Sequence, residues 1–344
     1  MISERRLAIL NLIIEHYLQT GEPMGSKTLC NLLPYTISSA TIRNEMAYLS
    51  ELGFLEQRHT SAGRVPSKAS YRFYVDNLME EQQVPEYNAK KIEEILSVNA
   101  GDPERLLADA ARLISQYTHC LGFCCTLEDS LDCIQGVDLI PAGNSKAMLV
   151  VLTVGSKIKS SLINLNCPLD DEFRFMFYNI MNKLFIGTPL TDVNRTLIQS
   201  TVQIAKERVF DMLPVLTSLC ALCNEASQSK LTFEGETNLL SHEELGSDVY
   251  KLLSFLADKG QMIHFSKEFS NHNIKQAMFI GDENPMYDLK NTSTILSKFT
   301  YGNNQTAVLG LIGSTRIDYK KIVSYVKYIF KTVDNLLSKE AQNG

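Results

Sequence analysis

Residues 38–66 read SSATIRNEMAYLSELGFLEQRHTSAGRVP, and this stretch decides the fold expected for the N-terminal part of the chain. Its first half has apolar residues at helical spacing, which predicts a helix with one buried face formed by Ile42, Met46, Leu49 and Leu52. Either serine at 38–39 can cap this helix, and Gly53 can end it. Residues 54–59 then read as a strand, residues 60–63 as a turn with Gly63 tolerating positive φ, and residues 64–66 as a short return strand.

The opposite face of the predicted helix carries small and polar residues. Ala40 and Ala47 would let the backbone approach a surface closely, while Arg43 and Asn44 offer side chains that pair with guanine and adenine in the major groove. Thr41 and Tyr48 lie at one flank of this face. The pattern is typical of a DNA recognition helix, although a merely solvated face would have the same periodicity.

Two helices are expected before this one. Residues 3–19 have a helical apolar stripe, and Gly21 with Pro23 would end that helix. Residues 27–33 form a shorter helical stretch that Pro34 stops. Two helices, a reading helix and a hairpin with basic residues follow one another in the order of a winged helix-turn-helix.

The basic residues of this segment suggest a narrow DNA footprint. The whole chain has a formal charge of −6, but between residues 54 and 74 four arginines and lysines oppose one acidic residue. Such cations can bind phosphates or the minor groove. The candidate DNA-binding residues are Ser39, Thr41, Arg43, Asn44, Tyr48, Arg58, His59, Thr60, Ser61, Arg64 and Lys68.

Several strings in this chain resemble the HrcA heat-shock repressors. They are TGEPMGSKT at 20–28, SSATIRNEM at 38–46, HTSAGRVP at 59–66 and YRFYVD at 71–76, with FEG at 233–235, IGDEN at 280–284 and GSTRIDY at 313–319. Two positions depart from the family pattern, because Ser314 stands where the family usually has Pro and Ile317 where it usually has Met. The departures affect local turn geometry in the last string.

The resemblance implies a function and three partners. The proteins that this chain resembles are dimeric repressors, which bind the CIRCE inverted-repeat operator upstream of the groE and dnaK operons. They lose activity on heating and depend on the GroEL chaperonin to regain it. Double-stranded operator DNA, a second copy of the chain and GroEL are therefore the expected partners, and no cofactor is expected.

Beyond residue 80 the sequence predicts an α+β body interrupted by a helical block. Strand-like runs at 134–140, 147–154 and 159–164 are punctuated by hairpin turns, which predicts an antiparallel meander. The resemblance implies which domains these parts form. We expect a winged helix with connector at 1–80, a GAF-like α+β domain at 85–168 and 276–340, and a mainly helical inserted dimerisation domain at 169–275.

Enzymatic and metal chemistry find little support in the sequence. Asp282, Glu283 and Asn284 form a polar cluster whose simpler interpretation is a turn, and Arg316 with Asp318 would cap the last helix. The CxxC at 220–223 lacks a second half and is expected to pack as apolar residues. The longest apolar run, at 147–154, is too short to cross a bilayer, and no signal peptide is evident. We therefore expect a cytoplasmic protein that is not an enzyme and binds no membrane.

Three functional hypotheses remain at this point. The first is a heat-shock repressor tuned by the chaperonin. The second is a small-molecule sensor that uses the same winged helix and a cavity in the GAF-like domain. The third is an enzyme or assembly protein whose winged helix binds protein and not DNA. Because one reading helix covers only a few base pairs, the repressor hypothesis requires a dimer on a two-fold operator.

Overall fold

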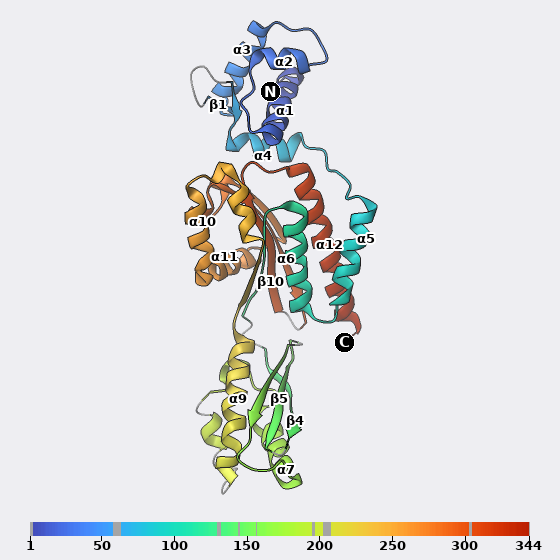
Figure 1. Cartoon of the computed structure of the whole chain (residues 1–344), viewed down its shortest axis with the longest axis vertical. Coiled ribbons are helices and arrows are strands. Elements are labelled where there is room, and N and C mark those ends of the chain that lie inside the picture. The colour runs from blue at the N-terminus through green and yellow to red at the C-terminus, as the bar shows by residue number, and fades with distance from the viewer. Residues whose placement is uncertain are drawn as a thin grey trace. The chain divides into compact units, whose positions relative to one another are not determined.

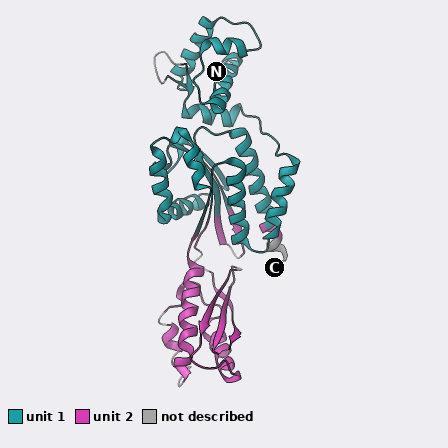
Figure 2. Cartoon of the chain, in the orientation of Figure 1, with its two compact units in different colours: residues 1–124, 231–298, 308–336 teal, residues 125–230, 299–307, 337–344 magenta. Residues whose placement is uncertain are grey.

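The structure is a computed structural model that describes residues 3–57, 63–128, 132–143, 145–155, 157–194, 197–201, 208–302 and 305–343. The chain consists of two compact units (Figure 2). Unit 1 comprises residues 1–124, 231–298 and 308–336, and unit 2 comprises residues 125–230, 299–307 and 337–344. Both units mix helices and sheets, so the fold is α+β, as the sequence predicted.

Residues 3–77 form the N-terminal module of unit 1. It contains the helices and strands α1 (Glu4–Thr20), α2 (Ser26–Leu32), α3 (Ser39–Glu51), β1 (Leu55–Glu56), β2 (Val65–Pro66) and α4 (Lys68–Asn77). Gly21 ends α1 in the left-handed conformation, at φ 72°, as predicted. The core of the module lies where α1, α2 and α3 meet, and its fully buried side chains include Ile9, Leu10, Ile13, Leu29 and Ile42.

The remainder of unit 1 is built on a five-stranded sheet with strand order β7-β3-β10-β9-β8. The strands are β3 (Leu121–Thr126), β7 (Lys230–Glu234), β8 (Gln276–Ile280), β9 (Thr292–Tyr301) and β10 (Gln305–Ser314), and β8 pairs with β9 in antiparallel register. The long helices are α5 (Glu86–Val98), α6 (Pro103–Thr118), α10 (Asp248–Ala257), α11 (Lys259–Asn271) and α12 (Tyr319–Asn343). Short turns of 3₁₀ helix connect them: η4 (Glu236–Ser241), η5 (Glu243–Leu245), η6 (Gly281–Glu283) and η7 (Tyr287–Leu289).

The helices of this body form two groups (Figure 1). Helices α5, α6 and α12 lie together, and the rings of Tyr117 and Tyr325 stack at 4.8 Å between α6 and α12. Helices α10 and α11 pack on each other as a separate pair. The apolar stripe of α12, with Val326, Ile329, Phe330 and Val333 buried, explains why the sequence predicted this helix well.

Unit 2 contains a three-stranded antiparallel meander, β4 (Ile134–Gly143), β5 (Lys146–Thr153) and β6 (Ile158–Asn164), as predicted. One face of this sheet packs on α9 (Val209–Ser227), and Phe173, Phe177 and Leu219 lie fully buried in the shared core. The other elements described in this unit are α7 (Asp171–Ile180), the π-helix η1 (Met181–Phe185) and the 3₁₀ helix η2 (Leu190–Asp192). Helix α9 is long and apolar enough to cross a membrane, a feature that was not predicted from the sequence. In the structure its apolar residues form part of this core.

The division into units differs from the predicted domain boundaries. Strands β4–β6 share a core with α7 and α9, so they belong to unit 2 and not to the first segment of the predicted 85–168 domain. Helices α10 and α11 belong to unit 1, although the predicted insertion ran to residue 275. A hydrophobic core is defined by which helix and sheet faces pack together. The sequence alone does not show which faces these are.

Candidate nucleic-acid interface

Helix α3 begins with a fully formed cap. The Ser38 hydroxyl accepts a hydrogen bond from the Thr41 amide at 3.1 Å and lies 2.8 Å from the Thr41 hydroxyl. This bond satisfies one of the amides that the first turn of a helix leaves unpaired. The cap fixes where the helix starts, and therefore which residues face outward.

Three of the predicted site residues lie together on the exposed side of α3. Arg43, Asn44 and Tyr48 are exposed, while Ser39 and Thr41 are half-buried. The Ser39 hydroxyl lies 2.8 Å from that of Ser26, and the same Ser26 hydroxyl accepts a hydrogen bond from Arg43 Nε at 3.3 Å. This bond uses one of the five N–H donors of the Arg43 guanidinium.

The buried face of α3 contains one charged residue that the sequence analysis missed. Glu45 is only 5% exposed, beside Ile42, Met46 and Leu49, and its carboxylate pairs with two arginines of α1. Arg6 Nε donates to Glu45 at 2.6 Å, and Arg5 also pairs with this carboxylate. The hydrogen bond from Arg6 holds the pKa of Glu45 below its ordinary value, and Arg5 adds to this effect while burial opposes it.

Arg6 also links Glu45 to the exposed face of α3. Its guanidinium carbon lies 3.7 Å from the centroid of the Tyr48 ring, a cation–π contact. The orientation of α3 on α1 and the position of Tyr48 therefore depend on one ion-pair cluster. A carboxylate inside an apolar stripe was the signal that could have revealed it, because a buried charge needs a partner.

The hairpin after α3 is short and closely packed. Leu55 pairs with Pro66 and Glu56 with Val65, and Met24 bridges to Arg64 through backbone hydrogen bonds of 3.0 and 2.9 Å. Gly63 is needed for a close approach of two backbone segments, since a Cβ there would lie 2.4 Å from the Met24 carbonyl oxygen.

The structure places the predicted hairpin residues in three different situations. Arg64 is half-buried and donates to Gln57 on the opposite side of the hairpin. The predicted contacts Arg58, His59, Thr60 and Ser61 lie outside the described residues. The ammonium group of Lys68 donates to residues 282, 290 and 291 of the body of unit 1.

The polar cluster at 282–284 is used within the fold. Asn284 is buried, and its amide donates to the carbonyls of Gly281 and Thr292 at 3.0 and 2.9 Å. Glu283 accepts from the Ile280 amide at 2.8 Å. The turn that the sequence suggested is therefore present, and in the described part of the chain no three His, Cys, Asp or Glu side chains gather as a metal site.

The two residues expected to steady the last helix behave differently. Asp318 does so, since its carboxylate accepts from the Lys321 amide at 3.1 Å. Arg316 does not cap α12. It pairs with Glu244 and donates to the Leu18 carbonyl of the N-terminal module at 3.4 Å.

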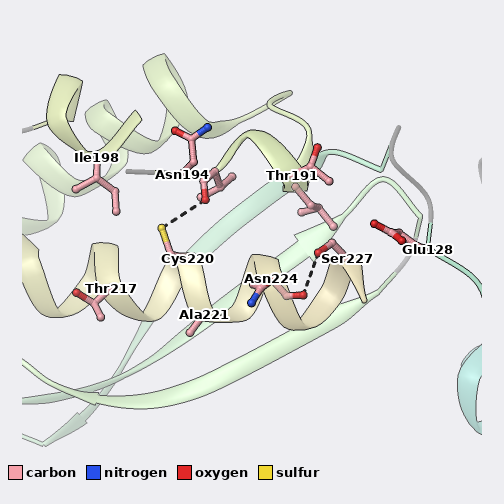
Figure 3. Close-up of a pocket in the computed structure, with 11 residues that line it drawn as sticks. Glu128, Thr191, Asn194, Ile198, Thr217, Cys220, Ala221, Asn224 and Ser227 are labelled. Atoms are coloured by element: carbon pink, nitrogen blue, oxygen red, sulfur yellow. Dashed lines mark hydrogen bonds between the residues drawn. The ribbon is translucent and has the colours of Figure 1, made fainter. Parts of the chain in front are cut away.

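A pocket of about 660 Å³ opens in unit 2 beside α9 (Figure 3). Among the described residues that line it, only Glu128 is charged, and most of the others are small or apolar. Cys220 lies in its wall and donates to the Val193 carbonyl at 3.6 Å, and burial raises the pKa of this thiol and of Cys223. The pocket lies in unit 2 and not where the sequence analysis placed a cavity.

Comparison with known proteins identifies the family. The family model of the HrcA protein C-terminal domain matches residues 104–323, well over half of the chain. The chain belongs to the HrcA family. A relative from Acetivibrio thermocellus, a heat-inducible transcription repressor HrcA, is 30% identical over 95% of this chain and 94% of its own length. A second HrcA repressor, from Ruminiclostridium cellulolyticum, is 28% identical over the full length of both chains.

The HrcA architecture also has a counterpart among solved structures. A crystal structure of a hypothetical protein superposes with a TM-score of 0.76 over 99% of this chain and 100% of its own, at 23% identity. At this identity the similarity concerns the fold alone. The HrcA family model begins at residue 104, so it does not include the N-terminal module, which the full-length relatives and the solved structure do cover.

Proposed function

We propose that this HrcA family member is a DNA-binding transcription repressor of the heat-shock response, whose N-terminal module is a winged helix. The exposed face of α3, with Arg43, Asn44 and Tyr48 on one side of a capped helix, is the observation that carries the proposal. The helix order of the module and the hairpin that follows α3 support it. So do the full-length relatives, which are named heat-inducible transcription repressors.

In this proposal α3 enters the major groove. Arg43 pairs with guanine and Asn44 with adenine, while Ser39, Thr41 and Tyr48 contact the backbone or base edges. Arg64 and the residues from 58 to 61 contact phosphate beside the groove. The operator is the CIRCE inverted repeat upstream of the groE and dnaK operons, and the site of action is the cytoplasm. The body of unit 1 corresponds to the GAF-like domain.

A homodimer is part of the proposal, and the outer face of the unit 2 sheet supports it. Ile140, Met148 and Leu162 lie side by side across β4, β5 and β6, and Leu152 pairs with Ile158 two rows away. Ile158 is 68% exposed and Leu162 58% exposed. The row between them consists of Asp138, Val150 and Ser160. Exposed apolar side chains gathered on one sheet face in this way are typical of a protein interface.

Release on heating and recovery through the GroEL chaperonin complete the proposal. Repression needs only a small free-energy difference in favour of the DNA-competent dimer, because native states are marginally stable. Moderate warming can then empty that state. A chaperonin that binds the inactive form and returns folded protein would restore repression.

The decisive experiment is a gel shift with the CIRCE operator at two temperatures, with and without GroEL. We expect specific binding to the operator, which falls steeply with salt, is lost on warming and is increased by the chaperonin. Scrambled DNA of the same length is the control. Absence of a shift with folded protein would overturn the repressor function, and the winged helix would then be a protein-binding module.

The same experiment distinguishes the small-molecule sensor. If GroEL leaves operator binding unchanged while a metabolite extract raises it, the pocket beside α9 becomes the candidate ligand site. Thr217→Phe and Ala221→Phe, two substitutions on the wall of that pocket, would then abolish the response to the extract without changing basal operator binding.

A further inference from the structure

Two cations of α4 are bound by an acidic turn of the body of unit 1. Lys68 Nζ lies 3.2 and 3.3 Å from the carboxylate oxygens of Asp282, 3.1 Å from the Lys290 carbonyl and 3.0 Å from the Asn291 side chain. One helical turn later, Arg72 donates through Nε and Nη2 to Glu283, at 2.9 and 2.6 Å, and through Nη2 to the Met278 carbonyl at 2.6 Å. Both cations are thus paired with acceptor groups of the body of unit 1.

Hydrogen bonds within the body of unit 1 hold the acidic turn. Gly281 adopts φ 61°, and a Cβ there would lie 2.6 Å from Lys68 Cδ, so the lysine stem lies directly on the turn. Glu283 accepts from the Ile280 amide, and Asn284 joins the turn to β9 by accepting from the Thr294 hydroxyl at 2.6 Å. A preorganised acceptor loses little freedom when it binds a guanidinium.

A second set of contacts holds the module near the end of α1. Arg316 donates to the Leu18 carbonyl at 3.4 Å, and its guanidinium lies against Gly21. Lys320 of α12 pairs with Glu15 of α1. The rings of Tyr71 and Tyr319, which lie 5.7 Å apart, add a contact to the set at α4. Two separated sets of contacts, one at α4 and one at α1, fix an orientation that one set alone would leave free to rotate.

We propose that Asp282 and Glu283 are positioning residues for DNA binding, which act through Lys68 and Arg72 to hold the module at one orientation. The inference rests on the proposed function and extends it to residues outside the module. A dimer reads two half-sites at a fixed separation, so its reading helices must be held at a matching distance and angle. A module on a loose tether would bind one half-site equally well, but would pay an entropic cost to reach the second.

The position of Lys68 follows from the same geometry. The sequence suggests a phosphate contact for this lysine, as for other cations near a hairpin. Its four oxygen partners, at 3.0 to 3.3 Å, show instead that its charge is already compensated inside unit 1. Lys68 and Arg72 therefore belong to the support of the module and not to the surface that meets DNA.

The test compares the variant Asp282→Asn/Glu283→Gln with wild-type protein on three DNAs: the whole operator, a single half-site, and operators with altered half-site spacing. These substitutions remove both charges but keep acceptor oxygens. We expect affinity for the whole operator to fall about tenfold, single half-site affinity to stay unchanged and the preference for one spacing to weaken. Glu94→Gln/Glu236→Gln removes two carboxylate charges from other exposed sites of unit 1 and should leave all three unchanged.

An exchange of charges provides the second arm. Lys68→Asp alone should reproduce the loss on the whole operator, and Lys68→Asp/Asp282→Lys should restore both affinity and spacing preference. If the exchange fails to rescue and single half-site binding also falls, Lys68 contacts phosphate and the inference is overturned. Tighter binding of the neutralised variant to every DNA would mean that the turn inhibits binding, which also contradicts positioning.

Failure of this inference is distinguishable from failure of the proposed function. If wild-type protein does not bind the operator, the proposed function fails and the inference fails with it. If wild-type protein binds with a defined spacing and the neutralised variant behaves identically, only the positioning role is overturned.

Discussion

At the scale of single residues, the proposed recognition of operator DNA depends on Arg43 and its neighbours on α3. Arg43 is exposed, but its orientation is restricted because its Nε donates to the Ser26 hydroxyl. The same hydroxyl also forms a hydrogen bond with the Ser39 hydroxyl. A long side chain that is oriented before binding loses less rotamer entropy when it meets a base. The proposal therefore makes Arg43 a base-reading residue and not a general phosphate contact.

Replacing Arg43 with Ala should cost about 1–3 kcal/mol in operator affinity and relax base preference at one position per half-site. The measurement is a competition gel shift with operators substituted singly at each base. Arg105→Ala removes the same charge from a residue outside the module and should leave affinity unchanged. Equal losses on operator and scrambled DNA would mean that Arg43 does not read bases.

Glu45 shows how a single residue can contribute to the stability of α3. Its pKa is lowered in the folded state, chiefly by the bond from Arg6, so its ion pairs stabilise the fold above its ordinary pKa of about 4.5. This stabilisation is lost as pH falls through the lowered value. The groups that face the carboxylate are Arg5 and Arg6, with Tyr48 beyond Arg6.

Glu45→Gln should therefore lower the free energy of unfolding at pH 7 and reduce the loss of stability on acidification below about pH 4.5. Denaturant titrations from pH 3 to pH 7 measure both effects. Glu51→Gln, on the exposed side of the same helix, is the matched control and should titrate like the wild type. Parallel pH profiles for Glu45→Gln and the wild type would contradict the role assigned to the cluster.

At the scale of elements, the hairpin depends on the close approach of two backbone segments. Gly63 lies against the Met24 carbonyl, next to the Met24–Arg64 bridge that ties the hairpin to the chain before α2. Backbone atoms cannot move aside as a flexible side chain can, so a methyl group there must break the bridge. The placement of Arg64 is expected to follow the bridge.

Gly63→Ala should destabilise the protein by about 1–3 kcal/mol and weaken binding to operator and scrambled DNA alike. Gly25→Ala is a strict control from the same segment, because a Cβ at Gly25 meets nothing within 4 Å. Unfolding midpoints and gel shifts on the two variants make the comparison. A Gly63→Ala protein with normal stability would show that the bridge does not govern the hairpin.

At the scale of the whole molecule, the proposed function requires two copies of the chain. In this proposal the module supplies one reading helix, whereas the apolar side chains on the outer face of β4–β6 lie in unit 2. If that face pairs with a second copy, the determinants of dimerisation and of DNA reading lie in different units of the chain. Changes in one unit should then affect operator binding through the oligomeric state alone.

Leu162→Lys should weaken self-association at least about tenfold, because burying a leucine side chain contributes about 1.5–3 kcal/mol. Sedimentation velocity over a concentration series measures this effect. Val98→Lys changes another exposed apolar residue, 80% exposed on α5, and should remain dimeric. A Leu162→Lys protein that stays fully dimeric would place the interface elsewhere.

The sequence by itself determined many of the elements and the exposed face of α3. Caps, glycines, prolines and apolar periodicity act within a few residues, so α1, α3, the β4–β6 meander and α12 could be predicted together with the exposed position of Arg43 and Asn44. Only the tertiary structure decided which charges meet. Glu45 finds Arg6 39 residues away, and Lys68 finds Asp282 214 residues away. Ion pairs of such separation depend on how cores pack, and hydrophobic periodicity carries no information about which cores meet. That is why the ion pairs of Glu45 and Lys68, and the division into the two units, could not be predicted from the sequence.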